Sequence, residues 1–135
     1  MKYLLDTCVI TDFIKNQKET VIRIKELKPN ELCISVITEF EIKYGIERVI
    51  GTKQGRYIAE ASNSIISVME VLEFSREIAE LAAKVRAKLS NLGTPIGAYD
   101  LLIAATAKYY DLTVVTSNIR EFERVEDLKI ENFRK

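Results

Sequence analysis

The sequence of 135 residues predicts an α/β fold, a three-layer α/β/α sandwich around a central, mainly parallel sheet. Short β-branched runs alternate with amphipathic helical segments, and the turn signals of β-hairpins are almost absent. The five glycines and two prolines separate short segments and form no linker. With 47% hydrophobic and 30% charged residues, the chain has a globular composition, so we expect a single domain over residues 1–135.

Apolar residues at helical spacing predict helices, and short β-branched runs predict strands. From the N-terminus, the predicted order is a strand at 2–6, helices at about 9–15 and 20–28, a strand at 32–37 and a helix from 38 to about 49. After a turn marked by Gly51 and Gly55, the order is a helix at 57–66, a strand at 68–74, helices at 75–92 and from 100, and strands at 112–116 and near 129–133.

Two polar residues are predicted to cap helices. Thr38 has Glu41 three residues later, which is the capping-box arrangement, and Ser75 precedes a long amphipathic segment. Two other acids, Asp12 and Glu39, are expected to face solvent on their helices.

The composition excludes several classes of chemistry. The chain contains no histidine, so it cannot use imidazole-based RNA cleavage, a Ser-His-Asp or Cys-His nucleophile, or a zinc site with His ligands. Twenty basic and twenty acidic residues cancel, so nucleic acid would have to meet a local patch rather than a strong overall field. Carboxylates must therefore carry any acid-base or metal chemistry.

The cellular location is predicted from the cysteines and the N-terminus. Cys8 and Cys33 lie in apolar segments without C-x-x-C spacing, so we expect both to be buried small hydrophobes. The N-terminal apolar run is too short and too acidic for a signal peptide or a membrane span. We therefore expect a cytoplasmic protein with no membrane association.

Four oxygen-bearing side chains are candidates for a shared site. Asp6 closes the first strand, Asn118 follows the strand at 112–116, and Glu41 and Asp100 are expected in the first turns of helices. Ligands of open α/β sheets bind beyond the carboxyl ends of the strands, so these side chains can converge there. Three of them have an alternative structural role: Glu41 as a capping partner, Asp100 as a helix N-terminal acid, and Asn118 as a turn residue.

A cluster of carboxylates favours a hard divalent cation. Two carboxylates about 4 Å apart repel by roughly 4 kcal/mol at an effective dielectric of 20, so positive charge is needed to stabilise three of them together. Mg²⁺ or Mn²⁺ suits oxygen ligands and can activate water for attack on phosphorus. Glu121, three residues after Asn118, is a possible substitute for it or a helper to it. The basic residues near these acids in sequence are candidates for weak phosphate contacts: Lys43, Arg48, Arg120 and Arg124.

Four segments resemble, in order and spacing, those of PIN-domain ribonuclease toxins of the VapC type, and the likeness spans essentially the whole chain. They are LLDTCVITDFI, ISVITEFEIKYGI, IGAYDLLIAATA and LTVVTSNIREFERVEDLKIENF. The resemblance implies a PIN-like fold and a Mg²⁺- or Mn²⁺-dependent endoribonuclease. It also implies a cognate antitoxin protein whose tail occupies the active-site groove, and a homodimer.

The same resemblance assigns roles to residues. The first three acids of the family fall on Asp6, Glu41 and Asp100, and its fourth polar position falls on Asn118. Asp6 and Asp100 are expected to be the principal metal ligands, with Glu41 completing the pocket and Thr116 and Ser117 fixing the loop. The chain departs from the family by having Asn118 where many members carry an acid, and Cys8 where Asn is common.

The sequence leads to three functional hypotheses. The first is an RNase toxin that hydrolyses a phosphodiester with metal-activated water, leaving a 5′-phosphate and a 3′-hydroxyl. The alternative is a catalytically weak or inactive PIN module that binds RNA or a partner protein, which Asn118 motivates. A phosphatase with an aspartate nucleophile is disfavoured because that chemistry usually requires Asp-x-Asp, and here Cys8 lies two residues after Asp6.

Overall fold

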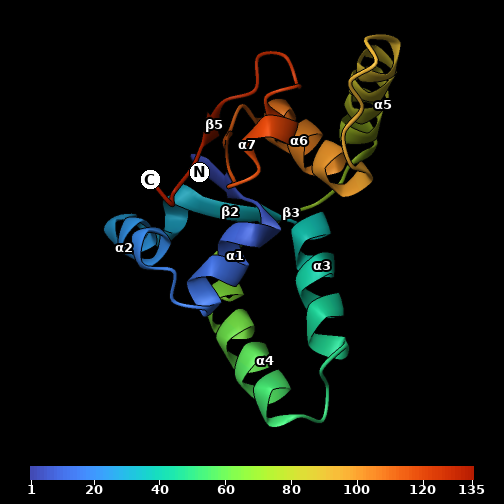
Figure 1. The fold of residues 1–135 in the computed structure, drawn as a ribbon. Coiled ribbons are helices and arrows are strands. Elements are labelled where there is room, and N and C mark those ends of the chain that lie inside the picture. The colour runs from blue at the N-terminus through green and yellow to red at the C-terminus, as the bar shows by residue number, and fades with distance from the viewer.

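The computed structural model describes all residues from 1 to 135 and contains one five-stranded sheet (Figure 1). The strand order is β3-β2-β1-β4-β5, and every neighbouring pair is parallel. The strands are β1 (Tyr3–Leu5), β2 (Leu32–Ser35), β3 (Glu70–Leu72), β4 (Thr113–Val115) and β5 (Ile130–Glu131). The predicted α/β class with a parallel sheet is confirmed, and β1 lies at its centre.

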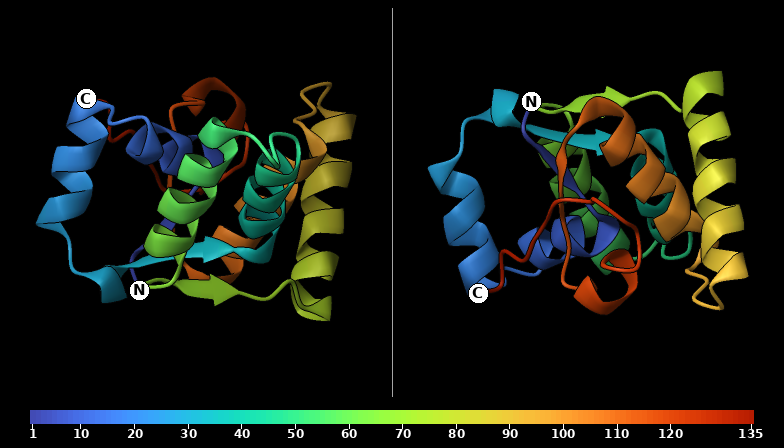
Figure 2. Two further views of the ribbon diagram at one scale, coloured as in Figure 1. Left: turned by 90° about the horizontal axis from the view of Figure 1, so that it is seen from below. Right: turned by 90° about the horizontal axis from the view of Figure 1, so that it is seen from above.

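Helices cover both faces of the sheet (Figure 2). On one face lie α1 (Thr7–Ile14), α2 (Lys18–Glu26), α3 (Val36–Glu47) and α4 (Lys53–Ile66). On the other lie α5 (Arg76–Asn91), α6 (Ala98–Tyr110) and the short α7 (Ile119–Phe122), and a 3-10 turn at Pro29–Glu31 precedes β2. In Figure 1, α3 and α4 extend together away from the sheet. No helix is long and apolar enough to cross a bilayer.

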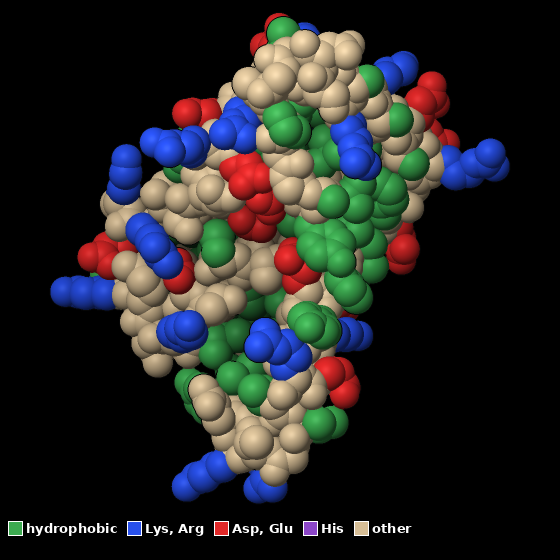
Figure 3. Space-filling model, turned by 45° about the vertical axis from the view of Figure 1, so that its right-hand side comes forward, with side chains coloured by type: hydrophobic (Ala, Val, Ile, Leu, Met, Phe, Trp, Pro, Cys, Tyr) green, Lys and Arg blue, Asp and Glu red, His purple; other side chains and the backbone are tan.

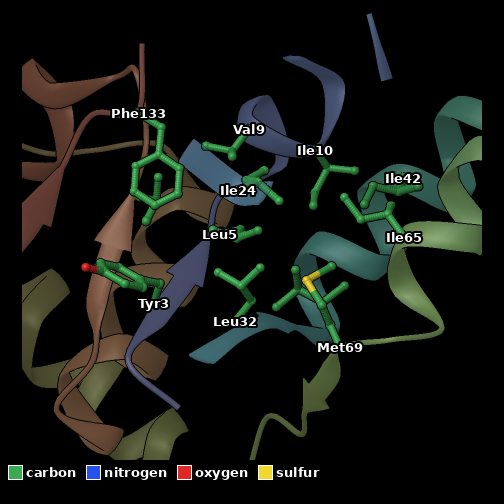
Figure 4. Close-up of a cluster of buried hydrophobic side chains, with 12 residues drawn as sticks. Tyr3, Leu5, Val9, Ile10, Ile24, Leu32, Ile42, Ile65, Met69 and Phe133 are labelled. Atoms are coloured by element: carbon green, nitrogen blue, oxygen red, sulfur yellow. The ribbon is translucent and has the colours of Figure 1, made fainter. Parts of the chain in front are cut away.

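The alternation of side chains along β1 divides the core in two. Tyr3 and Leu5 belong to the cluster beneath α1, α2 and α4, whereas Leu4 belongs to the cluster beneath α5 and α6. Figure 4 shows the first cluster, in which the rings of Tyr3 and Phe133 meet edge to face with centroids 5.6 Å apart. Full burial of an aliphatic side chain such as Leu4 or Leu5 stabilises the fold by about 1.5–3 kcal/mol. These contacts therefore fix the position of β1.

The predicted cap of α3 was wrong. Ser35, in extended conformation at the end of β2, is the N-cap, and its Oγ accepts a hydrogen bond from the Thr38 amide at 3.2 Å. The strand therefore ends at Ser35 rather than residue 37, and Thr38 is a buried helical residue. Glu41 consequently lies in the second turn of α3, not the first, and makes no capping contact. Ser75 caps α5 as predicted.

Two other local predictions were also wrong. Asp12 does not face solvent: it is 7% exposed, and its carboxylate accepts two hydrogen bonds from the Arg134 guanidinium, at 2.7 and 2.8 Å. This bidentate ion pair joins α1 to the C-terminus across 122 residues of sequence. Gly55 lies inside the first turn of α4 rather than in the preceding turn. It is buried there against the backbone at Val49, and Thr52 is the N-cap.

Candidate active site

Asp6 is held at the carboxyl end of the central strand. It is 5% exposed, and its backbone amide donates to the Val115 carbonyl at 2.9 Å, which ties β1 to β4. Its Oδ1 accepts from the Thr7 amide at 2.8 Å as the N-cap of α1, where the helix dipole favours a carboxylate. Its Oδ2 accepts from Thr116 Oγ1 at 2.8 Å. Asp6 is therefore both buried and fixed in orientation.

The loop after β4 is organised by the hydroxyl of Thr116. Besides donating to Asp6, Thr116 Oγ1 accepts from the Asn118 amide at 2.9 Å, so the predicted role of Thr116 in fixing this loop is confirmed. Cys8 Sγ lies 3.4 Å from Asp6 Oδ2 and 3.5 Å from Ser117 Oγ. Burial and the charge of Asp6 raise the pKa of the Cys8 thiol, which favours the protonated donor form. Cys33 is fully buried as predicted, whereas Cys8 is only partly buried.

Glu41 reaches the same crevice from α3. Its Oε1 accepts a hydrogen bond from Thr7 Oγ1 at 2.6 Å, and Thr7 directly follows Asp6. Thr7 therefore connects the second acid to the first. Sequence patterns did not single out Thr7, although its place after a strand-ending acid was a usable signal.

Asp100 and Asn118 meet on the opposite side of the crevice. Asp100 lies in the first turn of α6, and Asn118 Nδ2 donates to its Oδ2 at 3.3 Å. The same amide donates to Glu121 Oε2 at 3.1 Å, while the other Glu121 oxygen accepts from the Gly97 amide. These two hydrogen bonds lower the pKa of Glu121. Glu121, which the sequence suggested as a substitute for Asn118 or a helper to it, is thus a structural member of the cluster.

The four carboxylates interact electrostatically. Burial, followed in order of effect by the negative charges of Asp6, Glu121 and Glu41, raises the pKa of Asp100 to about 7. Figure 3 shows acidic side chains gathered at the middle of one face of the protein. The four residues that the sequence suggested for a shared site, Asp6, Glu41, Asp100 and Asn118, therefore line one crevice.

The donor set fits a hard divalent cation. Its members are carboxylate oxygens with no nitrogen or sulfur ligand required, and the negative charges of Asp6, Glu121 and Glu41 around Asp100 would stabilise a cation there. No group of three or more acidic or cysteine side chains lies close enough together to hold a metal ion. An open site of this kind suits Mg²⁺, which is typically held by one or two carboxylates and keeps several waters.

The basic residues near the site make few contacts with it. Lys43 pairs with Glu39 at 3.8 Å, and Arg124 Nη1 donates to the Pro95 carbonyl at 2.6 Å. Glu39, expected to face solvent, is partly exposed with this pairing. Arg48 is exposed at the C-terminal end of α3, and Arg120 is exposed on α7. None of the four basic side chains forms an ion pair with the clustered acids, although the charge of Arg124 helps to lower the pKa of Glu121.

Replacing Asp100 by asparagine is expected to stabilise the metal-free protein at neutral pH. The Asp100 carboxyl has a pKa of about 7 when folded against 3.8 as its ordinary value, so the folded state binds more protons between these values. Its contribution to stability therefore falls as pH rises through that window. Because the group is partly exposed and screened, we expect a gain of about 1–2 kcal/mol at pH 7.5 and none near pH 4. Thermal unfolding in EDTA at both pH values measures it, and an equal shift at both would contradict the electrostatic cause.

Comparison with known proteins agrees with this fold and site. Residues 3–128 match the PIN domain family. The chain is 38% identical over 135 residues to the tRNA(fMet)-specific endonuclease VapC of Salmonella typhimurium, covering 98% of both chains. It is 33% identical to a protein of the same name from Shigella flexneri, again over 98% of both chains.

Solved structures give the same result. The chain superposes with a TM-score of 0.87 on a chain of DNA-bound VapBC from Salmonella typhimurium, at 37% identity and 98% coverage of both chains. It also superposes with a TM-score of 0.87 on a chain of VapBC2 from Rickettsia felis bound to a promoter DNA fragment, at 31% identity and the same coverage. The chain therefore belongs to the PIN domain family. Its relatives there are the VapC ribonucleases, which confirms the fold and enzyme class expected from the sequence.

Proposed function

We propose that the chain, as a single PIN domain over residues 1–135, is a divalent-metal-dependent endoribonuclease and the toxin of a toxin-antitoxin pair. The observation that carries the proposal is the convergence of Asp6, Glu41 and Asp100 beyond the carboxyl ends of the central strands. This acidic crevice belongs to a chain that is 38% identical to a VapC endonuclease over its full length. The absence of histidine leaves these carboxylates as the groups available for hydrolysis.

The acids divide into ligands and supporting residues. Asp6 and Asp100 would hold Mg²⁺ or Mn²⁺, and Glu41 completes the pocket from α3. When bound, the cation supplies a Lewis acid that activates water and offsets charge on the scissile phosphate. Asn118 is a positioning residue, because its amide donates to both Asp100 and Glu121 and fixes their orientation. Thr116 does the same for Asp6 through its hydroxyl.

The substrate is proposed to be transfer RNA. Two relatives that match over 98% of the chain are named for cleavage of tRNA(fMet). The net charge of zero implies that local groups around the crevice, rather than long-range attraction, must select the RNA. Because transfer RNA is found in the cytoplasm, we propose that the protein acts there.

Two protein partners are also proposed. The first is a cognate antitoxin that covers the active-site groove, supported by relatives solved as VapBC assemblies. The second is another copy of this chain. Phe40 and Tyr99 are about half-exposed on α3 and α6 and pack edge to face with centroids 5.7 Å apart, and Tyr44 extends this apolar surface. An exposed aromatic surface of this type is typical of protein interfaces.

Purified, antitoxin-free protein is expected to cleave tRNA(fMet) at a defined position with Mg²⁺ or Mn²⁺, and EDTA should stop the reaction. Added Mg²⁺ should also raise the melting temperature, because a ligand that binds only the folded state stabilises it by mass action. Gel analysis of end-labelled tRNA and thermal unfolding measure the two effects. RNA binding without cleavage under either metal would instead favour the inactive PIN module that Asn118 allows.

A further inference from the structure

A cavity of about 450 Å³ opens beside the acidic crevice, between α1, α3 and α4. Thr7 and Glu41 belong to both, and they are joined by the hydrogen bond of 2.6 Å described above. A molecule in the cavity would therefore be adjacent to a phosphodiester at the acids. Figure 3 shows a hollow with apolar side chains between the acidic patch and the far end of α3 and α4, with basic side chains beside it.

The cavity wall contains a polar atom without a partner. Ser62, on α4, is 0% exposed and lines the cavity, and its Oγ makes no hydrogen bond within the chain. Buried hydroxyl groups are normally paired, because an unpaired one is unfavourable. A serine in a helix can pair with the carbonyl four residues earlier, yet Ser62 does not do so. The cavity therefore offers an internal hydrogen-bonding group to a ligand.

The mouth of the cavity is aromatic, amide-bearing and basic. The Tyr57 ring is 54% exposed, and its hydroxyl donates to the Ile14 carbonyl at 3.3 Å, which holds the ring between α4 and α1. Gln54, one turn earlier on α4, presents an amide with both donors and an acceptor. Arg48 adds a positive charge from the end of α3. These groups match a flat, polar-edged ring that is linked to a phosphate.

We infer that this cavity binds an unpaired nucleobase of the RNA next to the cleaved bond and thereby selects the cleavage position. The inference rests on the proposed ribonuclease function. Proteins recognise RNA sequence mainly through unstacked bases that stack on aromatic rings and pair through their edges. The cavity volume lies within the usual range for small-ligand sites, and polar side chains outnumber hydrophobic ones along its lining.

Two variants test whether the cavity binds RNA, one by removing a polar group and one by filling space. Ser62→Ala removes the unpartnered hydroxyl, and Gly45→Leu fills the open wall, since a Cβ at Gly45 meets no atom within 4 Å. We expect Ser62→Ala to raise KM for tRNA(fMet) about fivefold without lowering the melting temperature. We expect Gly45→Leu to lower kcat/KM at least tenfold and to spread cleavage over several positions. The matched controls are Ser64→Ala and Glu47→Leu, which change exposed residues of the same two helices outside this cavity.

A binding measurement separates this inference from the proposed function. In an Asp6→Asn background, fluorescence anisotropy with labelled tRNA(fMet) reports binding without cleavage. Weaker RNA binding by both cavity variants, with unchanged controls, supports the cavity even if the native protein cuts no RNA. Unchanged RNA affinity in both variants overturns the inference, also where native cleavage is normal. It is equally overturned if the variants weaken only the binding of a protein partner.

Discussion

Asp6→Asn is expected to lower kcat for RNA cleavage by about 1000-fold, the effect of losing a few kcal/mol of transition-state stabilisation. The substitution removes the negative charge of the acid that is fixed most firmly in the crevice, by Thr7 and Thr116. The asparagine oxygen can still accept from the Thr7 amide as an N-cap, so the fold should be retained. Cleavage of end-labelled tRNA under single-turnover conditions measures the loss.

Glu39→Gln is the matched control for this experiment. Glu39 lies two residues before Glu41 on α3 but pairs with Lys43 rather than with the acids of the crevice. The Glu39→Gln protein should therefore cleave tRNA at the native rate. Circular dichroism and melting temperature show that each variant is folded. A folded Asp6→Asn protein that retains native kcat would exclude Asp6 as a metal ligand and with it the proposed mechanism.

Gly55→Ala is expected to destabilise the protein by about 3 kcal/mol, near the upper end for overpacked sites. A Cβ at this position would lie 2.0 Å from the Val49 carbonyl oxygen and 2.8 Å from the Val49 carbonyl carbon. Both are backbone atoms, so no side chain can rotate to relieve the clash. The start of α4 must therefore move away from the end of α3. Urea unfolding followed by circular dichroism measures the change.

Gly45→Ala is the corresponding control, because it makes the same substitution in a neighbouring helix where space is open. Alanine loses less backbone entropy than glycine on forming a helix, so this variant should be more stable by about 0.5–1 kcal/mol. Opposite signs for the two variants are the expected result. Equal effects would show that helix propensity, rather than the approach of α4 to Val49, controls stability here.

Several features of the site were predictable because they depend on local sequence. Asp6 closes an apolar strand, and Asp100 begins an apolar helix. Parallel strands place their carboxyl ends at one edge, so the position of Asp6 followed once the alternation of strands and helices was recognised. Ser75 was also predictable as a cap, since capping depends on residues within one turn.

Other features depend on contacts between distant residues. Thr38 was a plausible cap by sequence, but Ser35 takes that role because the chain leaves the sheet there and buries Thr38. Asp12 has the pattern of a surface acid, yet Arg134 reaches it from the C-terminus. Neither partner choice is encoded within a short window of sequence.

The sequence by itself determined the order of strands and helices and the residue types available for chemistry, because periodicity and composition are local properties. The PIN-like class followed from the resemblance of four segments to VapC-type toxins. Only the tertiary structure decided that Glu121 joins the acids, that Thr7 links Asp6 to Glu41, and that a cavity with the unpaired Ser62 hydroxyl lies beside them. The physical reason is that hydrogen bonds, burial and charge repulsion act through distance in space. Those distances are set by how the helices pack on the sheet.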